Sequence, residues 1–400
     1  MDGAHSKSIG ILIAWPGLMP MDHAGAVRGA AFAEAVLSLG WKLLVVTPED
    51  GSTYQHSFDP ERFRTLRLYD SYAKRYPPPI PMLLLPLTVA RLSSLARRQR
   101  IGGIISSCPG LFLALEALLV SKLVGVAFFL DVRDAWKLEE RTHAGPIRNR
   151  FKRRVEGFLC RDAARVWAVT ESLARMLVDD HHLSPQKVSV VPNGADLSRF
   201  SPRSGPKSYD LIFLGVPSAY RDLPRLFSAF HYLARRRPSV RILWVGWRPP
   251  DLTNRDRSVL QELVGQRVLE LHPPVAHDSV PGLLNQARAG VVSLSHEDVF
   301  RVAVGAKTYE YLACGLPLFC LGPEGQSELR SLVESENVGF FSSDSDDFSF
   351  QVNHVLSDQT LMDALSGNCL RVAARYDRVE IARRALLDPA FLPENRSHRS

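Results

Sequence analysis

The chain has 400 residues, more than one ordinary hydrophobic core accommodates, so two domains are expected. Hydrophobic residues make up 46% and charged residues 23%, a globular composition that excludes a disordered or low-complexity protein. The formal net charge of +7 predicts a surface that attracts anions. Nucleic acid, anionic lipid and phosphorylated small molecules all fit that charge.

The cysteine pattern and the lengths of the apolar runs predict the cellular compartment of the protein. The five cysteines are scattered without a CxxC pair, which indicates free thiols in a reducing environment. The N-terminal segment lacks the long apolar region of a signal peptide. No run approaches the roughly 20 apolar residues of a membrane span, and the longest candidate, Leu111–Leu130, contains Glu116 and Lys122. We therefore expect a soluble, cytoplasmic protein.

Short apolar runs alternate with helical patterns along the first half of the chain, which predicts a parallel sheet covered by helices. The predicted strands are Ile9–Ala14, Lys42–Thr47, Ile101–Ser106, Val126–Leu130, Arg165–Val169 and Val188–Val191. The predicted helices are Val27–Leu39, Leu87–Arg100, Leu111–Val124, Ile147–Leu159 and Glu171–Asp179. Thr170 follows a strand directly and is expected to cap the last of these helices.

A polar segment rich in Pro, Ser and Gly, Ser198–Ser208, interrupts the pattern and is predicted to be the interdomain linker. The alternation then resumes with strands at Tyr209–Gly215, Val240–Gly246, Val268–Leu271, Gly290–Leu294 and Leu318–Leu321. The predicted organisation is a Rossmann-like domain at 1–197, the linker at 198–208, a second such domain at 209–360, and a C-terminal helix with tail at 361–400. In open parallel sheets ligands bind at the carboxyl ends of the strands, so functional residues are expected in the loops that follow strands.

Two such loops in the second domain have residues suited to a phosphate. Gly305 lets the backbone approach an anion, and the helix that begins after it offers free amide groups, with the charge of Lys307 beside them. Glu310, one turn further, can accept hydrogen bonds from two hydroxyl groups. The alternative is an ordinary amphipathic helix with a solvated Lys307–Glu310 pair. In the other loop, Arg221 follows Gly215 by six residues, and its guanidinium suits a phosphate unless it serves as a surface cation.

A third loop, in the first domain, has three charged residues directly after a buried strand. Asp131, Arg133 and Asp134 follow five apolar residues, at the position where an α/β sheet binds its ligand. The alternative is an Asp–Arg pair that fixes the loop.

These segments resemble family 4 retaining glycosyltransferases, which have the two-domain GT-B fold, and in particular the bacterial transferases for surface polysaccharides and lipid-linked sugars. The matching segments are Val190–Pro202, Phe213–Phe230, Ala306–Phe319 and Phe128–Lys137, and the resemblance runs from about residue 10 to 340. It implies two facing Rossmann-like domains, an N-terminal one for the acceptor and a C-terminal one for a nucleotide-sugar, with the final helix crossing back to the first domain.

The resemblance also implies roles for individual residues. Gly215, Arg221, Gly305 and Lys307 would bind the donor diphosphate, Glu310 the ribose, and Gly25 would open the first helix beside the donor. Asp131, Arg133 and Asp134 would be the catalytic residues, because the histidine that many members have near this loop is absent. Two positions depart from the family pattern. Val302 stands where an earlier glutamate is common, for which Glu297 or Asp298 could substitute, and Val216 replaces a second arginine.

The implied reaction retains the anomeric configuration and uses no metal or cofactor. UDP is expected ahead of GDP, and the acceptor is a sugar or a lipid-linked sugar. Two basic segments, Lys74–Arg100 and Arg148–Arg154, predict contact with an anionic membrane surface at the inner face of the plasma membrane, or else are solvated helix faces. Nucleic-acid binding is not expected, since the cations lack interleaved aromatic residues. The alternatives are a non-hydrolysing nucleotide-sugar epimerase and a degenerate, non-catalytic nucleotide-sugar-binding protein.

Overall fold

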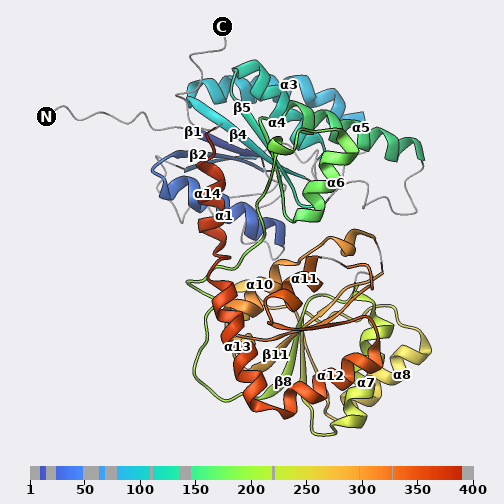
Figure 1. The fold of residues 1–400 in the computed structure, drawn as a ribbon. Coiled ribbons are helices and arrows are strands. Elements are labelled where there is room, and N and C mark those ends of the chain that lie inside the picture. The colour runs from blue at the N-terminus through green and yellow to red at the C-terminus, as the bar shows by residue number, and fades with distance from the viewer. Residues whose placement is uncertain are drawn as a thin grey trace, which may run out of the picture. The chain divides into compact units, whose positions relative to one another are not determined.

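The computed structural model describes residues 10–14, 24–47, 63–67, 79–108, 111–134, 146–218, 221–296, 298–326 and 328–389. The chain forms two compact units. Unit 1 comprises residues 1–192 and 378–400, and unit 2 comprises residues 193–377. Each unit contains one parallel sheet with helices packed against it (Figure 1).

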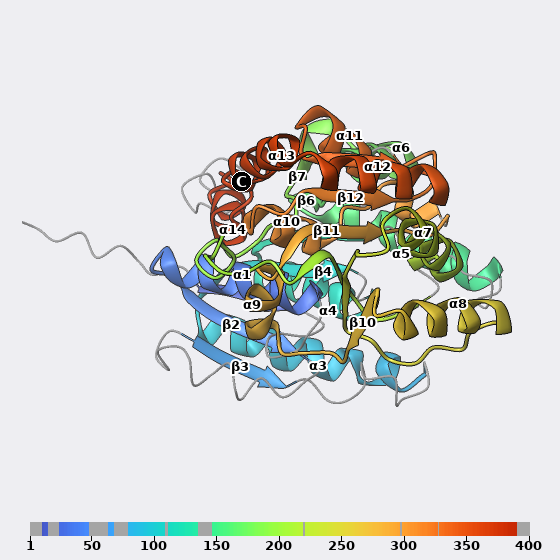
Figure 2. The ribbon, with the colours of Figure 1, turned by 90° about the horizontal axis from the view of Figure 1, so that it is seen from below.

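The sheet of unit 1 has the strand order β3-β2-β1-β4-β5-β6-β7, with β3 at one edge (Figure 2). Its strands are β1 (Gly10–Ala14), β2 (Lys42–Thr47), β3 (Phe63–Arg67), β4 (Ile101–Cys108), β5 (Ala127–Val132), β6 (Arg165–Ala168) and β7 (Val188–Val190). In the register of β4 and β5, Ser107 lies opposite Asp131. These two polar residues therefore meet at the carboxyl ends of neighbouring strands.

Side chains of β5 alternate between the two faces of this sheet. Phe128, Leu130 and Val132 join the core cluster of α3 (Pro79–Arg98), α4 (Leu111–Val124), α5 (Pro146–Asp162) and α6 (Glu171–His181). On the other face, α1 (Ala24–Ser38) packs Phe32 against Trp167, which also contacts Phe129. The last helix, α14 (Arg378–Leu386), lies against α1 (Figure 1), and Asp388 just beyond it pairs with Arg165 at 3.0 Å.

Unit 2 has the strand order β10-β9-β8-β11-β12-β13, which is the order of a dinucleotide-binding Rossmann fold. Its strands are β8 (Tyr209–Leu214), β9 (Ile242–Val245), β10 (Leu269–His272), β11 (Ala287–Ser293), β12 (Leu318–Leu321) and β13 (Gly339–Ser342). The order reverses between β8 and β11, and the carboxyl ends of these two strands are where such a fold binds its ligand.

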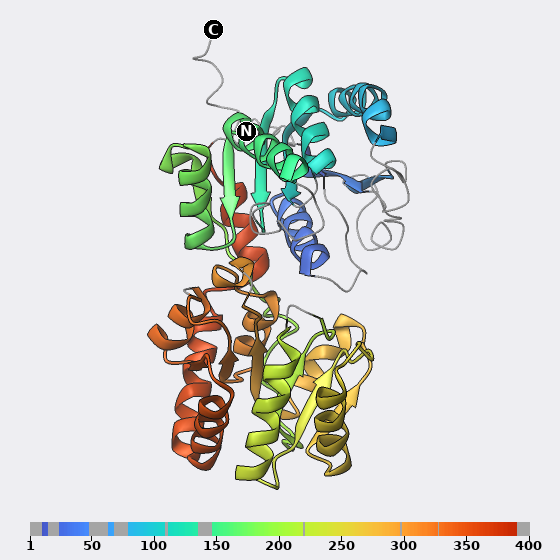
Figure 3. The same ribbon diagram turned by 90° about the vertical axis from the view of Figure 1, so that its right-hand side faces the viewer.

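Helices cover both faces of the unit 2 sheet (Figure 3). One face carries α7 (Leu223–Arg236), α8 (Asn254–Gly265) and α12 (Ser345–Ser357). The other carries α9 (Val280–Leu284), α10 (Ala306–Ala313), α11 (Glu328–Ser335) and α13 (Gln359–Ala373). The predicted fold class, two Rossmann-like α/β domains with a final helix that returns to the first, is confirmed.

Several details differ from the sequence-based expectations. The segment 198–208 is not a free linker but part of unit 2, because Asn285 binds both Ser201 O (3.0 Å) and Arg203 N (2.7 Å). The predicted final helix is two helices, of which α13 belongs to unit 2 and only α14 to unit 1. Strands β3 and β13 were not predicted.

Two helix starts show how side chains cap exposed amides. Asp344 caps α12 and accepts hydrogen bonds from the amides of Asp346 and Asp347. Thr170 caps α6 as predicted, accepting from Leu173 N at 3.3 Å.

Two further properties concern the helices and the thiols. Within the described ranges, no helix combines the length and apolarity needed to cross a membrane. Cys160, Cys314, Cys320 and Cys369 are buried free thiols. Burial raises the pKa of each, so these cysteines act as small hydrophobic side chains rather than nucleophiles.

Candidate active site

The loop after β8 brings the backbone and Arg221 close together. Gly215 has φ +138°, and a Cβ at this position would lie 3.3 Å from Nη2 of Arg221. The indole nitrogen of Trp244 donates to Gly215 O at 2.8 Å. Gly246, with φ +98°, approaches the same backbone so closely that a Cβ there would be 3.0 Å from Gly215 C. Both glycines are therefore required by conformation and by space.

Arg221 and Lys307 place two positive charges at this end of the sheet. Lys307 Nζ donates to Leu214 O at 2.8 Å and lies 4.3 Å from the centre of the Phe213 ring. Burial, followed by the charge of Arg221, lowers the pKa of Lys307 well below its ordinary value. Burial also lowers the pKa of Arg221, whose Nε has no hydrogen-bond partner among the described residues.

Neither of these cations forms an ion pair with a carboxylate in the part of the chain that the structure describes. Two partly buried like charges that repel each other raise the free energy of the ligand-free fold. An anion bound beside them would remove that cost.

Helix α10 supplies the third element of the site. Gly305 is its N-cap, with φ −70° and ψ 148°, and no side chain caps the first turn. Tyr311 fixes the helix to the sheet, since its hydroxyl accepts from Leu214 N at 2.9 Å and donates to Val291 O at 3.4 Å. A Cβ on Gly290 would be 2.6 Å from the Tyr311 ring, so the glycine makes room for that contact.

Glu310 lies in α10, with an exposed side-chain fraction of 8%, and its Oε1 is 2.9 Å from Nε2 of His277. His277 begins a short 3-10 helix, His277–Ser279, between β10 and α9. Sequence reasoning missed His277, because nothing in a polar segment 33 residues away marks it as a neighbour of Glu310.

Part of the matching segment Val190–Pro202 packs against the residues that precede α10 and against His277. Asn193 Nδ2 donates to Val304 O at 3.3 Å, one residue before the helix cap. Ala195 N donates to Tyr376 O at 2.9 Å, and Phe200 contacts the His277 ring. This segment therefore supports the start of α10 and the seat of His277 from within unit 2.

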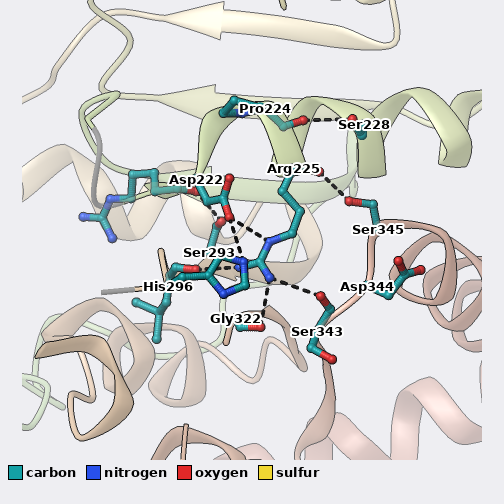
Figure 4. Close-up of polar contacts among 12 residues, drawn as sticks. Asp222, Pro224, Arg225, Ser228, Ser293, His296, Gly322, Ser343, Asp344 and Ser345 are labelled. Atoms are coloured by element: carbon teal, nitrogen blue, oxygen red, sulfur yellow. Dashed lines mark hydrogen bonds and ion pairs between the residues drawn. The ribbon is translucent and has the colours of Figure 1, made fainter. Parts of the chain in front are cut away.

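Arg225 of α7 joins the carboxyl ends of three neighbouring strands (Figure 4). Its guanidinium donates to Leu294 O after β11 (2.9 Å), Gly322 O after β12 (3.2 Å) and Ser343 O after β13 (3.1 Å). It also pairs at 3.0 Å with Asp222, the residue that follows Arg221. Burial lowers the pKa of Arg225, and the three carbonyls with Asp222 replace the water it has lost.

The backbone around Arg221 is held by its neighbours Ser293 and Asp222. Ser293 Oγ donates to Arg221 O at 2.5 Å, and Asp222 adopts the left-handed conformation with φ +47°. The exposed imidazole of His296 approaches Asp222 at 3.5 Å. Asp222, Arg225 and Ser293 were not predicted as site residues, because their role depends on contacts between strands distant in sequence.

In unit 1, Asp131 is fully buried in an ion pair with Arg28 of α1. Arg28 donates to the carboxylate through Nη2 (2.6 Å) and Nε (3.1 Å), and also to Val191 O and Pro192 O. Ser107 Oγ donates to Asp131 at 3.1 Å. These partners enclose the carboxylate, and no part of Asp131 reaches solvent. Asp131 is therefore held in a buried ion pair that links β5 to α1, and its catalytic role stays a prediction.

The other two predicted catalytic residues are partly exposed. Arg133 Nε donates to Ser107 Oγ at 3.0 Å, so the ion pair and the loop are linked. Burial raises the pKa of Asp134, against the lowering effect of Arg133. Gly25 lies in the first turn of α1. Glu297, which could replace the missing family glutamate, lies outside the described residues, while Asp298 begins a short 3-10 helix.

Residues 25–194 match the model of the glycosyl transferase 4-like domain family. This match covers less than half of the chain and lies almost wholly within unit 1. No curated protein sequence matches the chain.

Several solved structures share the fold of this protein over nearly its whole length. A glycosyltransferase from Rickettsia africae has a TM-score of 0.72 at 15% identity and covers 96% of this chain and 98% of its own. Sucrose-phosphate synthase from Thermosynechococcus elongatus has a TM-score of 0.69 at 16% identity, covering 95% and 97%. Anabaena HepE in complex with UDP-glucose has a TM-score of 0.68 at 17% identity, covering 94% and 98%. At these identities the likeness establishes the GT-B fold.

The predicted donor residues thus lie in unit 2, except Gly25 in α1 of unit 1, and the predicted catalytic residues lie in unit 1. In unit 2, Gly215, Arg221 and Lys307 converge at the end of β8, and Glu310 lies on the helix that carries Lys307. Among the described residues, no group of three His, Cys, Asp or Glu side chains is placed to hold a metal ion.

Proposed function

We propose that this protein is a glycosyltransferase that moves a sugar from a nucleoside-diphosphate donor to an acceptor hydroxyl, with retention of configuration and without a metal, in polysaccharide or glycoconjugate biosynthesis. The observation that carries the proposal is the pair of partly buried cations, Arg221 and Lys307, with no carboxylate ion pair in the described residues. A diphosphate is the group in such a donor that would balance both charges.

The surrounding elements support the same assignment. The uncapped first turn of α10 presents amides to an anion, and Gly215 permits close approach of the backbone. Glu310 follows one turn later, where a ribose attached to the diphosphate would place its hydroxyls. The UDP-glucose held by the similar Anabaena protein makes UDP the first nucleotide to test.

The reaction breaks the bond between the sugar's anomeric carbon and the diphosphate oxygen and forms a glycosidic bond to the acceptor oxygen. The acceptor's proton passes to the departing diphosphate, as the family resemblance implies. Arg221, Lys307 and the dipole of α10 stabilise the negative charge that develops on the leaving group. These groups are fixed by Ser293, Arg225 and Tyr311 and need little reorganisation during reaction.

Unit 1 would bind the acceptor. Arg133 and Asp134 have side chains that an acceptor can reach, and we assign them contacts with the reacting sugars. Asp131 and its partner Arg28 are buried, so they would hold the loop of Arg133 and Asp134 in place rather than touch substrate.

A lipid-linked acceptor at an anionic membrane is the acceptor class that the surface of unit 1 favours. Exposed apolar residues, Leu83 and Leu87 on α3 and Phe151 and Phe158 on α5, occur on helices that also expose basic residues. Those exposed cations are Arg91, Arg97, Arg98, Arg150, Arg153 and Arg154. Apolar side chains among cations are typical of a surface that binds anionic lipid, and the enzyme would be peripheral at the inner face of the membrane.

A thermal-shift screen tests the proposed donor site. The purified protein is heated with UDP, GDP, TDP, CMP or ADP, in EDTA and in Mg²⁺, together with Glu310→Ala and the exposed control Glu334→Ala. A shift with one nucleoside diphosphate in EDTA, lost in Glu310→Ala and kept in Glu334→Ala, is expected. No shift with any nucleotide would favour a non-catalytic protein, and nucleotide-sugar turnover to an epimer without acceptor would favour an epimerase.

A further inference from the structure

His277 is joined to Glu310 but lies on a different element of unit 2. Its Nε2 is 2.9 Å from Glu310 Oε1, and both side chains are largely buried, with exposed fractions of 13% and 8%. An ionised carboxylate only accepts hydrogen bonds, so the imidazole proton in this contact is on Nε2. The pair therefore fixes the rotamer of Glu310 through a charge-assisted hydrogen bond in a poorly hydrated place.

The short helix that begins at His277 is fixed by contacts with neighbouring residues. Phe200 packs against the imidazole with ring centres 5.3 Å apart, and Arg199 pairs with the adjacent Asp278. Asn285, at the end of α9, binds the backbone at Ser201. The short helix that begins at His277 is thus attached to the segment 199–203, so the imidazole cannot turn without moving that segment.

The second ring nitrogen of His277, Nδ1, indicates that the imidazole serves only to contact Glu310. Nδ1 is buried and has no hydrogen-bond partner among the described residues. A buried polar atom without a partner is destabilising, and a purely packing role would be filled better by an apolar side chain. The one polar contact the imidazole makes in the described structure is therefore the reason for a histidine at this position.

We propose that His277 is a positioning residue that sets the orientation of Glu310 for the ribose hydroxyls of the nucleotide. The inference rests on the proposed function of the donor site. A carboxylate has about four acceptor positions, so Glu310 has the capacity to accept from His277 and from ligand hydroxyl groups at the same time. A carboxylate free to rotate would lose part of that binding, because misplaced groups bind their target weakly.

The test compares two ligands that differ only at the ribose. UDP and 2′,3′-dideoxyuridine diphosphate are titrated calorimetrically into the full-length wild type, His277→Ala, His277→Gln and Glu310→Ala. In the matched control, His231→Ala, the substituted histidine also contacts a glutamate, Glu262 at 3.6 Å, between α7 and α8. The readout is the ratio of the two dissociation constants, which a general loss of folding would not change.

The wild type is expected to bind UDP about tenfold more tightly than the dideoxy analogue, the effect of a hydrogen bond to a charged group. In His277→Ala the two ligands should bind about equally, as in Glu310→Ala. His277→Gln should keep most of the preference, since a glutamine amide can donate to the same carboxylate, and His231→Ala should keep all of it.

Two results would overturn the inference while leaving the donor site intact. One is a preference for UDP that depends on Glu310 but persists in His277→Ala. The other is an equal weakening of both ligands in His277→Ala, which would show a purely structural role. A wild type that binds neither ligand would overturn the proposed function of the donor site together with this inference.

Discussion

Replacing Asp131 by asparagine should destabilise unit 1 rather than act only on the reaction. Asp131 accepts from Arg28 at 2.6 and 3.1 Å and from Ser107 at 3.1 Å, with no solvent exposure. The neutral amide in Asp131→Asn would leave the buried guanidinium without a counter-charge, and breaking a buried ion pair in this way costs about 3–5 kcal/mol. For a domain of about 200 residues, that loss lowers Tm by about 6–20 °C.

Thermal unfolding followed by circular dichroism measures this shift. Asp134→Asn is the matched control, since burial raises the pKa of Asp134 and its charge therefore does not stabilise the fold at neutral pH. Its Tm should change little. The double substitution Arg28→Met with Asp131→Leu should recover much of the loss, because both buried charges are then removed. If Asp131→Asn kept its Tm but abolished sugar transfer, the structural assignment would be refuted.

Other substitutions test the donor site and the surface. Lys307→Met should weaken UDP binding at least tenfold. Because burial lowers the folded pKa of Lys307, the folded protein binds this proton less tightly than the unfolded chain, so stability rises with pH up to about 10.4 in the wild type. In equilibrium unfolding across pH, Lys307→Met should lack that rise; an unchanged slope would contradict the cause given for the shift. Arg225→Lys should lower Tm by about 4–10 °C, as a lysine cannot serve three carbonyls in the geometry of a guanidinium, whereas exposed Arg235→Lys should not. Flotation with anionic liposomes should recover the protein at low salt and lose it when Arg150, Arg153 and Arg154 are changed to glutamate; binding to neutral vesicles alone would exclude the basic surface as the cause.

The sequence was sufficient for features that depend on neighbouring residues. Alternation of apolar runs and helices predicted two parallel sheets, and the glycine, lysine and glutamate of α10 are spaced by the turns of a single helix. Thr170 was recognised as a cap because capping involves residues three apart. Asp344 caps α12 in the same local way, with its side chain accepting from the amides of Asp346 and Asp347.

Features that depend on contacts between distant segments could not be predicted. His277 meets Glu310 across 33 residues, and Arg225 reaches Ser343 across 118. The ion pair of Asp131 in β5 with Arg28 in α1 joins residues 103 positions apart. Strand β3, with the sequence FRTLR, escaped notice because its polar residues interrupt any apolar run, and β13 because it is only four residues long.

The most direct test of the central claim is a calorimetric titration of UDP and UMP, in EDTA, into the wild type and Arg221→Gln, with exposed Arg235→Gln as control. If Arg221 and Lys307 bind the donor diphosphate, the wild type and the control will bind UDP at least tenfold more tightly than UMP, and Arg221→Gln will lose most of that preference. Equal affinity of the wild type for UDP and UMP, or a preference for UDP that appears only with Mg²⁺, would contradict the account.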